Sequence, residues 1–270
     1  MPIARVLLRR MALACVLAMG ASACSDAPAL TDLADMPDAM AARGGVKGPP
    51  DKGGGGGGGD DGGSNGSGTV AEDFGGTTLD PNLWTASTHP LGRGTFDPDN
   101  VSLRGGSLYL TTPAGTYDGA EIQSKQMFPP GAFEARLKAS PAVGSLTAFF
   151  LYSFHDEIDI EIIPTPNGGE VYFVTYERVW DPDLGRYTFD KTHLAVRSLN
   201  FDPSADFHTY RIETKKNKVR FFIDDQLRAQ FTRNIPASEM HLLASTWWPT
   251  WLDGLRPTSD VSAVIDWINY

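Results

Sequence analysis

Apolar and polar residues alternate with a period of two in several short segments of this chain. Segments 101–104 and 107–110 carry apolar residues at every second position and flank Gly105-Gly106, which predicts two strands about a tight turn. The same alternation recurs over 133–138 and 219–224. No uninterrupted stretch keeps the helical period of about 3.6 residues over a dozen positions. The pattern therefore predicts an all-β domain.

The domain that these strands build is expected to occupy residues 69–270. Many short strands separated by turn residues, in a domain of about 200 residues, are typical of a β-sandwich. A concave sheet face in such a sandwich can hold an extended ligand.

Glycine is the one residue type with an uneven distribution. Of the 29 glycines, 14 lie between Gly44 and Gly68. Such a segment can bury almost nothing, so residues 24–68 are expected to be a flexible tether, rich in Gly, Asp and Pro, that holds the domain away from a membrane. A low-complexity insertion without function is the alternative.

Residues 1–23 have the features of a secretory signal, with three arginines, an apolar run too short to span a bilayer, and small residues up to Ala23. Cys24 follows directly, and the segment ASAC resembles a bacterial lipobox, which predicts diacylation of Cys24. Cleavage after Ala23 without lipidation is the alternative. We expect an exported protein, either an outer-membrane lipoprotein or a periplasmic or extracellular protein, with membrane contact only through the lipid.

The formal net charge of the chain is −10. Residues 69–270 contribute −9 of it, from 17 basic and 26 acidic side chains. A surface of this sign argues against nucleic acid as a partner and suits an uncharged or cationic partner better than an anionic one. We expect the domain to be a monomer.

The segment HDEIDIEII, residues 155–163, places acids and isoleucines on opposite faces of a strand. The isoleucines are predicted to enter the core. The other face carries three acids with no Lys or Arg between them, which we call the acid row: Glu157, Asp159 and Glu161. Like charges this close disfavour one another's ionisation, so stability does not explain the arrangement.

The spacing of the acid row is that of a retaining glycosidase. The Cα atoms of Glu157 and Glu161 lie about 13 Å apart on a strand, and side chains that lean inward bring the carboxyls to about 5.5 Å. One glutamate can then attack an anomeric carbon. The other, its pKa raised by the neighbouring charge, can protonate the leaving oxygen and later deprotonate water. A solvated strand face and a site for a cation such as Ca²⁺ are the alternatives.

The acid row resembles the active-site strand of glycoside hydrolase family 16, whose motif is E-x-D-x-E. The resemblance includes Tyr117–Ser140 upstream, Asn200–Arg228 downstream and the closing IDWINY, and so covers the chain from about Glu72 to Tyr270. It implies a β-jelly-roll sandwich of two antiparallel sheets, with an open substrate cleft on the concave face.

The resemblance also implies a reaction and the residues that carry it out. The reaction is endo-acting, retaining cleavage of a β-glucan: mixed-linkage β-1,3-1,4-glucan, β-1,3-glucan or xyloglucan. Glu157 corresponds to the nucleophile, Asp159 to its assistant and Glu161 to the acid/base. A transglycosylase, in which a sugar hydroxyl replaces water, would use the same acids. A surface glycan-binding lipoprotein without catalysis is a further alternative, but a binder has no reason to keep three crowded acids.

Four positions are predicted to contact substrate. Gln123 stands where lichenases of the family carry an arginine, and His155 precedes the motif as in the family's xyloglucan enzymes. Trp247 matches a platform position and Trp251 follows it closely, and aromatic rings pack well on the C–H faces of sugars. Core packing is the alternative for the tryptophans, and capping of the cleft wall is the alternative for His155.

No cofactor is required by this chemistry, and the sequence specifies no metal site. Asp266 matches a position at which some family members hold a structural Ca²⁺. A hydrogen-bonded carboxylate at a strand end is the alternative for that residue, and it is the one we favour.

Overall fold

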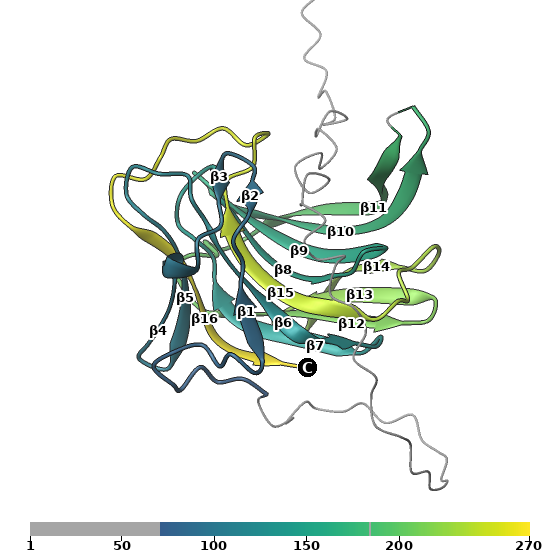
Figure 1. The fold of residues 1–270 in the computed structure, drawn as a ribbon, viewed down its shortest axis with the longest axis horizontal. Helices are drawn as coiled ribbons and strands as arrows, with labels where there is room; N and C mark the ends of the chain where they lie inside the picture. Colours follow the sequence, from purple (N-terminus) through teal and green to yellow (C-terminus); the bar gives the residue numbers. More distant parts are fainter. Residues whose placement is uncertain (1–70, 184) are drawn as a thin grey trace, which may run out of the picture.

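The structure, a computed structural model, describes residues 71–183 and 185–270. The signal segment, Cys24 and the tether lie outside the described residues. The described chain forms a β-sandwich (Figure 1), as the alternation predicts. The first sheet has the strand order β1-β6-β15-β8-β9-β10-β11, and the second has the order β14-β13-β12-β7-β16-β5-β4. All pairings within both sheets are antiparallel, which confirms the predicted jelly-roll sandwich.

The strands of the first sheet are β1 (Trp84–Ala86), β6 (Ala120–Phe128), β15 (Met240–Trp247), β8 (Leu146–Tyr152), β9 (Asp156–Thr165), β10 (Gly168–Asp181) and β11 (Arg186–Leu199). Those of the second sheet are β14 (Gln226–Phe231), β13 (Lys218–Ile223), β12 (His208–Lys215), β7 (Ala132–Lys138), β16 (Val261–Asn269), β5 (Ser107–Thr112) and β4 (Val101–Arg104). A small hairpin joins β2 (Pro90–Leu91) to β3 (Gly94–Thr95), and η2 (Pro98–Asn100) is a 3₁₀ turn. No helix in this described part of the chain is long and apolar enough to cross a bilayer.

The predicted turn at Gly105-Gly106 joins β4 to β5. Both glycines have positive φ, +61° and +75°. Two consecutive positive φ values characterise the type I′ turn, whose twist matches that of antiparallel strands, and glycine adopts them without steric cost. The sequence therefore specifies this hairpin locally.

The main core lies between the two sheets. Ile158, Ile160 and Ile162 of β9 enter it and have no exposed surface. Phe173 of β10 meets Phe221 of β13 from the second sheet, with ring centroids 5.0 Å apart. Burial of the isoleucines fixes the register of β9, because a slip by one residue would turn the acids into the core.

The opposite face of the first sheet, which we call the acid face, carries a second apolar cluster. Its buried members include Phe150 and Tyr152 of β8, Tyr176 of β10 and Leu243 of β15. The strands of this face are far apart in sequence, since β15 lies between β6 and β8. The acid row therefore projects from a surface that is assembled by long-range pairing.

Candidate active site

The acid row lies on β9 with the predicted alternation, but its side chains are buried. Glu157 is 2% exposed, Asp159 3% and Glu161 5%. This burial excludes the solvated strand face as an interpretation. Glu157 Oε2 and Asp159 Oδ2 have no hydrogen-bond partner among the described residues, so each has acceptor or donor capacity that a ligand can use.

Strand pairing places rings or a small side chain beside the two glutamates of the acid row. Glu157 lies opposite Tyr152 of β8 and Tyr176 of β10. Glu161 lies opposite Ala148 of β8 and Tyr172 of β10. The low polarity of these neighbours keeps water from screening the carboxyls and strengthens their mutual interactions.

Burial raises the pKa of every carboxyl in the acid row. It raises the pKa of Glu157, with the charge of Glu161 as the next cause, and it raises the pKa of Glu161 to about 7. The pKa of Asp159 is raised well above its ordinary range, by burial first and then by the two glutamates. The sequence predicts that a neighbouring charge raises the pKa of the acid/base, but in the structure burial raises the pKa of Glu161 and the charge of Lys191 lowers it.

The proton on Asp159 has a direct consequence for Glu157. A hydrogen bond between the two side chains lowers the pKa of Glu157 and raises that of Asp159. Protonated Asp159 thus donates to the Glu157 carboxylate and favours its ionised form. The ammonium of Lys191, next to Tyr176 across β10 and β11, lowers the pKa of Glu161 and of Asp159. The proton on Asp159 therefore stabilises the negative charge of Glu157, the predicted nucleophile.

A fourth buried acid, Glu121 of β6, also lies on the acid face and was not identified from the sequence. It is 3% exposed and accepts a hydrogen bond from Ser87 Oγ at 2.7 Å, while His89 Nε2 lies 4.0 Å from its Oε1. Glu121 is the cross-strand partner of Ser245 on β15, Ser245 is the partner of Ala148 on β8, and Ala148 is the partner of Glu161 on β9. Glu121 and Glu161 therefore lie at the same level of the sheet. The alternation in AEIQSK, which places Glu121 and Gln123 on one face, could have revealed it.

Glu121 is expected to make the fold more stable in mild acid than at neutral pH. Burial raises its pKa from 4.5 to about 7, so between these values the folded protein holds a proton that the unfolded chain has released. The free energy of unfolding should therefore fall as the pH rises from 4.5 to about 7, by up to about 3 kcal/mol from this group. Urea unfolding at several pH values tests this. Glu121→Gln should flatten the dependence, and the exposed Glu177→Gln should not; equal slopes for all three proteins would contradict the assignment.

Gln123 lies on β6, next to the edge strand β1, and His155 lies in the turn that precedes β9. Gln123 and Asp159 lie at the same level of the sheet, with Leu243 of β15 and Phe150 of β8 between them. Three strand spacings separate the two backbones by about 14 Å. Its Oε1 has no partner among the described residues. His155 is exposed, two residues before Glu157, and its ring lies edge to face with Phe154. Both positions suit contacts with sugar units outside the reacting one, and their roles stay predictions.

The tryptophans differ in accessibility. Trp248 is fully buried, and Trp247 is only 4% exposed. The β2–β3 turn covers Trp247 so closely that a Cβ on Gly92, whose φ is +59°, would lie 2.9 Å from its ring. This cover argues against the predicted platform role of Trp247. Trp251 is partly exposed and stacks on Tyr172, with centroids 6.0 Å apart, which keeps it as the candidate platform near Glu161.

The described residues do not assemble a metal site. Among them, no group of three or more His, Cys, Asp and Glu side chains is placed to hold a metal ion. Asp266 instead forms an ion pair with Arg136 of the neighbouring strand β7, in agreement with the favoured role as a hydrogen-bonded carboxylate.

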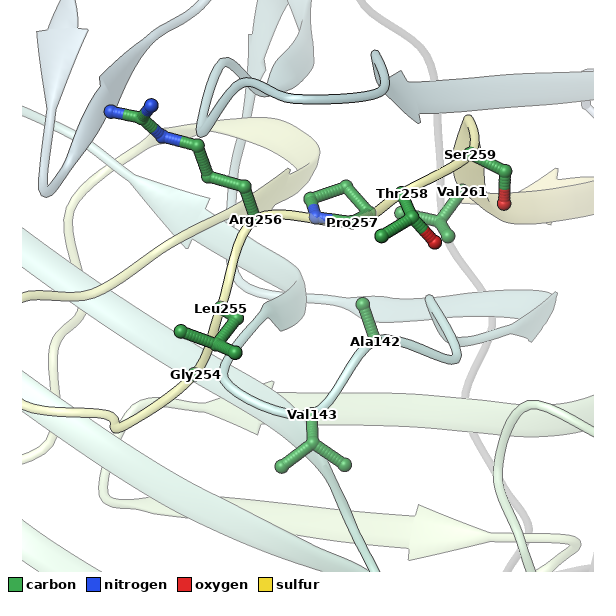
Figure 2. A pocket seen from close by; sticks show the side chains of 9 residues that line it. All are labelled: Ala142, Val143, Gly254, Leu255, Arg256, Pro257, Thr258, Ser259 and Val261. Carbon is green, nitrogen blue, oxygen red and sulfur yellow. The ribbon is translucent and has the colours of Figure 1, made fainter.

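Two cavities in the described part of the chain lie apart from the acid row. One, of about 480 Å³, lies between Ala142-Val143 and the loop Gly254–Val261 (Figure 2), and Arg256 extends away from its other lining side chains. The second, of about 310 Å³, is lined by Asp156, Glu177 and the segment Asn234–Ser238. Neither contains Glu157, Asp159 or Glu161, so the chemistry belongs to the sheet face and not to these cavities.

Known proteins are similar to this chain in sequence and in fold. The family model described as glycosyl hydrolases family 16 matches residues 92–269. The β-glucanase of Bacillus subtilis (strain 168) is 28% identical over 190 residues, which cover 65% of this chain and 74% of that protein. The solved β-glucanase of Bacillus licheniformis has a TM-score of 0.61 and 24% identity, covering 75% of this chain and 97% of that one. The κ-carrageenase of Pseudoalteromonas carrageenovora has a TM-score of 0.64 and 20% identity, covering 74% and 91%.

Proposed function

Because this chain belongs to glycosyl hydrolases family 16, we propose that it is an endo-acting β-glucan hydrolase that retains anomeric configuration. The observation that carries the proposal is the acid row, three buried carboxyls on one face of β9. The fold alone would not distinguish β-glucan from other polysaccharides, since the κ-carrageenase has the same fold.

The proposed reaction is a double displacement. The Glu157 carboxylate attacks the anomeric carbon while the Glu161 carboxylic acid donates its proton to the departing glycosidic oxygen, so the C–O bond of the polymer breaks as the glycosyl-enzyme ester forms. Glu161, now ionised, removes a proton from water, and the resulting hydroxyl displaces Glu157 from the anomeric carbon. Two inversions give net retention, and both glutamates return to their starting protonation states.

Asp159 is proposed to act through Glu157. Its hydrogen bond stabilises the Glu157 carboxylate in the free enzyme and again when the ester is hydrolysed and the carboxylate departs. Lys191 favours ionisation of Glu161, which the second step requires. Burial keeps Glu161 protonated for the first step, so the two influences place its pKa near the middle of the physiological range.

The proposed substrate is a neutral β-glucan, as the names of the related β-glucanases suggest. A panel of mixed-linkage glucan, laminarin, xyloglucan, agarose and carrageenan, read by reducing ends and product size, tests this. We expect internal cleavage of at least one of the three glucans and none of carrageenan, whose sulfates would be repelled by a domain of charge −9. Cleavage of carrageenan alone would overturn the substrate class. When an oligosaccharide is added to the reaction as an acceptor, products longer than that oligosaccharide would identify transglycosylation.

The proposed location is the outer membrane, with Cys24 as the lipid attachment site. Cys24→Ala should move the protein from the membrane fraction to the soluble fraction of the producing cell. An unchanged distribution would refute lipidation and leave cleavage after Ala23 as the interpretation.

A further inference from the structure

The distal part of the β10–β11 hairpin extends beyond the other strands of the first sheet. β9 pairs with β10 only as far as Glu177, whereas β10 and β11 stay paired to Asp181 and Arg186. We call residues 178–181 and 186–189 the arm, and Figure 1 shows it bending away from β13 and β14. Since an isolated two-stranded ribbon is only marginally stable, contacts to the rest of the domain must fix its position.

Arg178 connects the arm to the turn that precedes the acid row. Its backbone N–H donates to the carbonyl oxygen of His155 at 2.7 Å. Its guanidinium carbon lies 4.0 Å from the ring centroid of Phe154 and 5.3 Å from that of Phe189. These cation–π contacts hold the arm in a fixed relation to Glu157, which follows His155 by two residues.

The aromatic face of the arm continues the acid face. Because side chains alternate along β10, Arg178 and Trp180 lie on the same side as Tyr176. Tyr176 is the cross-strand partner of Glu157 and belongs to the apolar cluster of the acid face. Trp180 pairs with Tyr187 across the arm and lies about 13 Å from Tyr176 along the strand.

Three rings on this surface are exposed although they contact one another. Trp180 is 55% exposed, Tyr187 44% and Phe154 42%. Trp180 and Tyr187 meet at 75° with centroids 5.2 Å apart, and Phe154 and Tyr187 meet at 68° and 5.7 Å. An edge-to-face contact covers one face of only one of its two rings, and the exposed fractions show that about half of each side chain stays accessible although Arg178 lies over Phe154. A clustered aromatic surface at the end of a hairpin contributes little to the core and marks an interaction site.

We propose that the arm is an additional binding site for the polysaccharide chain, in which Trp180, Tyr187 and Phe154 stack on neutral sugar units beyond those held at the acid row. We expect a glucan chain to be the ligand because the arm continues the acid face. A glucan chain that is bound at Glu157 and extends toward His155 would meet these rings next. Pyranose C–H faces match open aromatic faces. The inference rests on the proposed function, since the ligand is the same β-glucan.

The test compares a long and a short substrate. In the double variant Trp180→Ala/Tyr187→Ala, we expect the KM for polymeric β-glucan to rise about tenfold, which corresponds to about 1.4 kcal/mol, with kcat unchanged. Hydrolysis of the shortest cleavable oligosaccharide should be unaffected, because it does not reach the arm. The double variant Trp180→Phe/Tyr187→Phe keeps an aromatic ring at each of the two positions and should bind the polymer as the wild type does. The matched control is Leu227→Ala, an apolar side chain 53% exposed on β14 of the other sheet.

Affinity electrophoresis in gels containing the polymer measures the same affinity without turnover. Unchanged polymer affinity in the alanine variant would overturn the inference, and so would an equal loss on polymer and oligosaccharide. If the double alanine variant proves unstable, the single variants Trp180→Ala and Tyr187→Ala replace it, and polymer affinity equal to that of the wild type in both would overturn the inference. A wild-type protein that is retarded by glucan but does not cleave it would overturn the proposed hydrolysis, and loss of that retardation in the alanine variant would still support the arm.

Discussion

Replacing Glu157 by Gln is expected to reduce hydrolysis of soluble β-glucan by about 10⁴-fold or more. The amide has the shape of the carboxyl but cannot form the glycosyl ester, and the hydrogen bond from Asp159 then has no carboxylate to stabilise. The fold should persist, because the variant removes a buried ionisable group from a crowded row. Initial rates of reducing-end release measure the effect, and thermal unfolding monitors the fold.

The matched control for this change is Glu177→Gln. Glu177 is an exposed carboxylate on β10, opposite Asp156 at the start of β9, so it lies close to the acid row in the sheet without belonging to it. We expect the control to retain nearly full activity. Turnover by Glu157→Gln that equals the wild-type rate would falsify the assignment of the nucleophile.

Replacing Glu161 by Gln should slow hydrolysis of the polymer by about 10² to 10⁴-fold, the usual contribution of a general acid/base. Glycan hydroxyls are poor leaving groups and need the proton. An aryl glycoside with an acidic phenol does not need it, so formation of the glycosyl-enzyme from that substrate should be affected far less. Rates on both substrates, measured before and after steady state, separate the two steps.

The same variant tests the pH dependence. Burial raises the pKa of Glu161 to about 7, so the wild-type rate of polymer hydrolysis should decline as the pH rises through that value and the acid loses its proton. Glu161→Gln cannot ionise at this position and should lack that decline. An identical alkaline limb in both proteins would show that Glu161 is not the general acid.

Local patterns in the sequence determine much of the fold. The glycine pair between β4 and β5 specifies its turn through two positive φ values, and β7 and β13 follow directly from alternation. On β9, the same alternation separates the isoleucines from the acids, so the face of each candidate catalytic side chain could be predicted without knowledge of the neighbouring strands.

Properties that depend on long-range pairing could not be read in this way. Burial of the acid row comes from β8 and β10 on either side, and the closeness of Glu121 to His89 comes from chain segments that only the tertiary fold brings together. The cover over Trp247 depends on the close approach of the Gly92 turn. Alternation likewise gives no sign that β10 and β11 extend past β9, because strand length relative to a neighbour is a property of the sheet.

The central claim is that the acid row hydrolyses β-glucan with retention of configuration. Proton NMR of the wild-type enzyme acting on mixed-linkage glucan tests it most directly, since the anomeric signal of the new reducing end is visible before mutarotation. The account predicts that the β-anomer appears first and that the α-anomer grows in later. Initial appearance of the α-anomer, or no new reducing ends from any β-glucan, would contradict it.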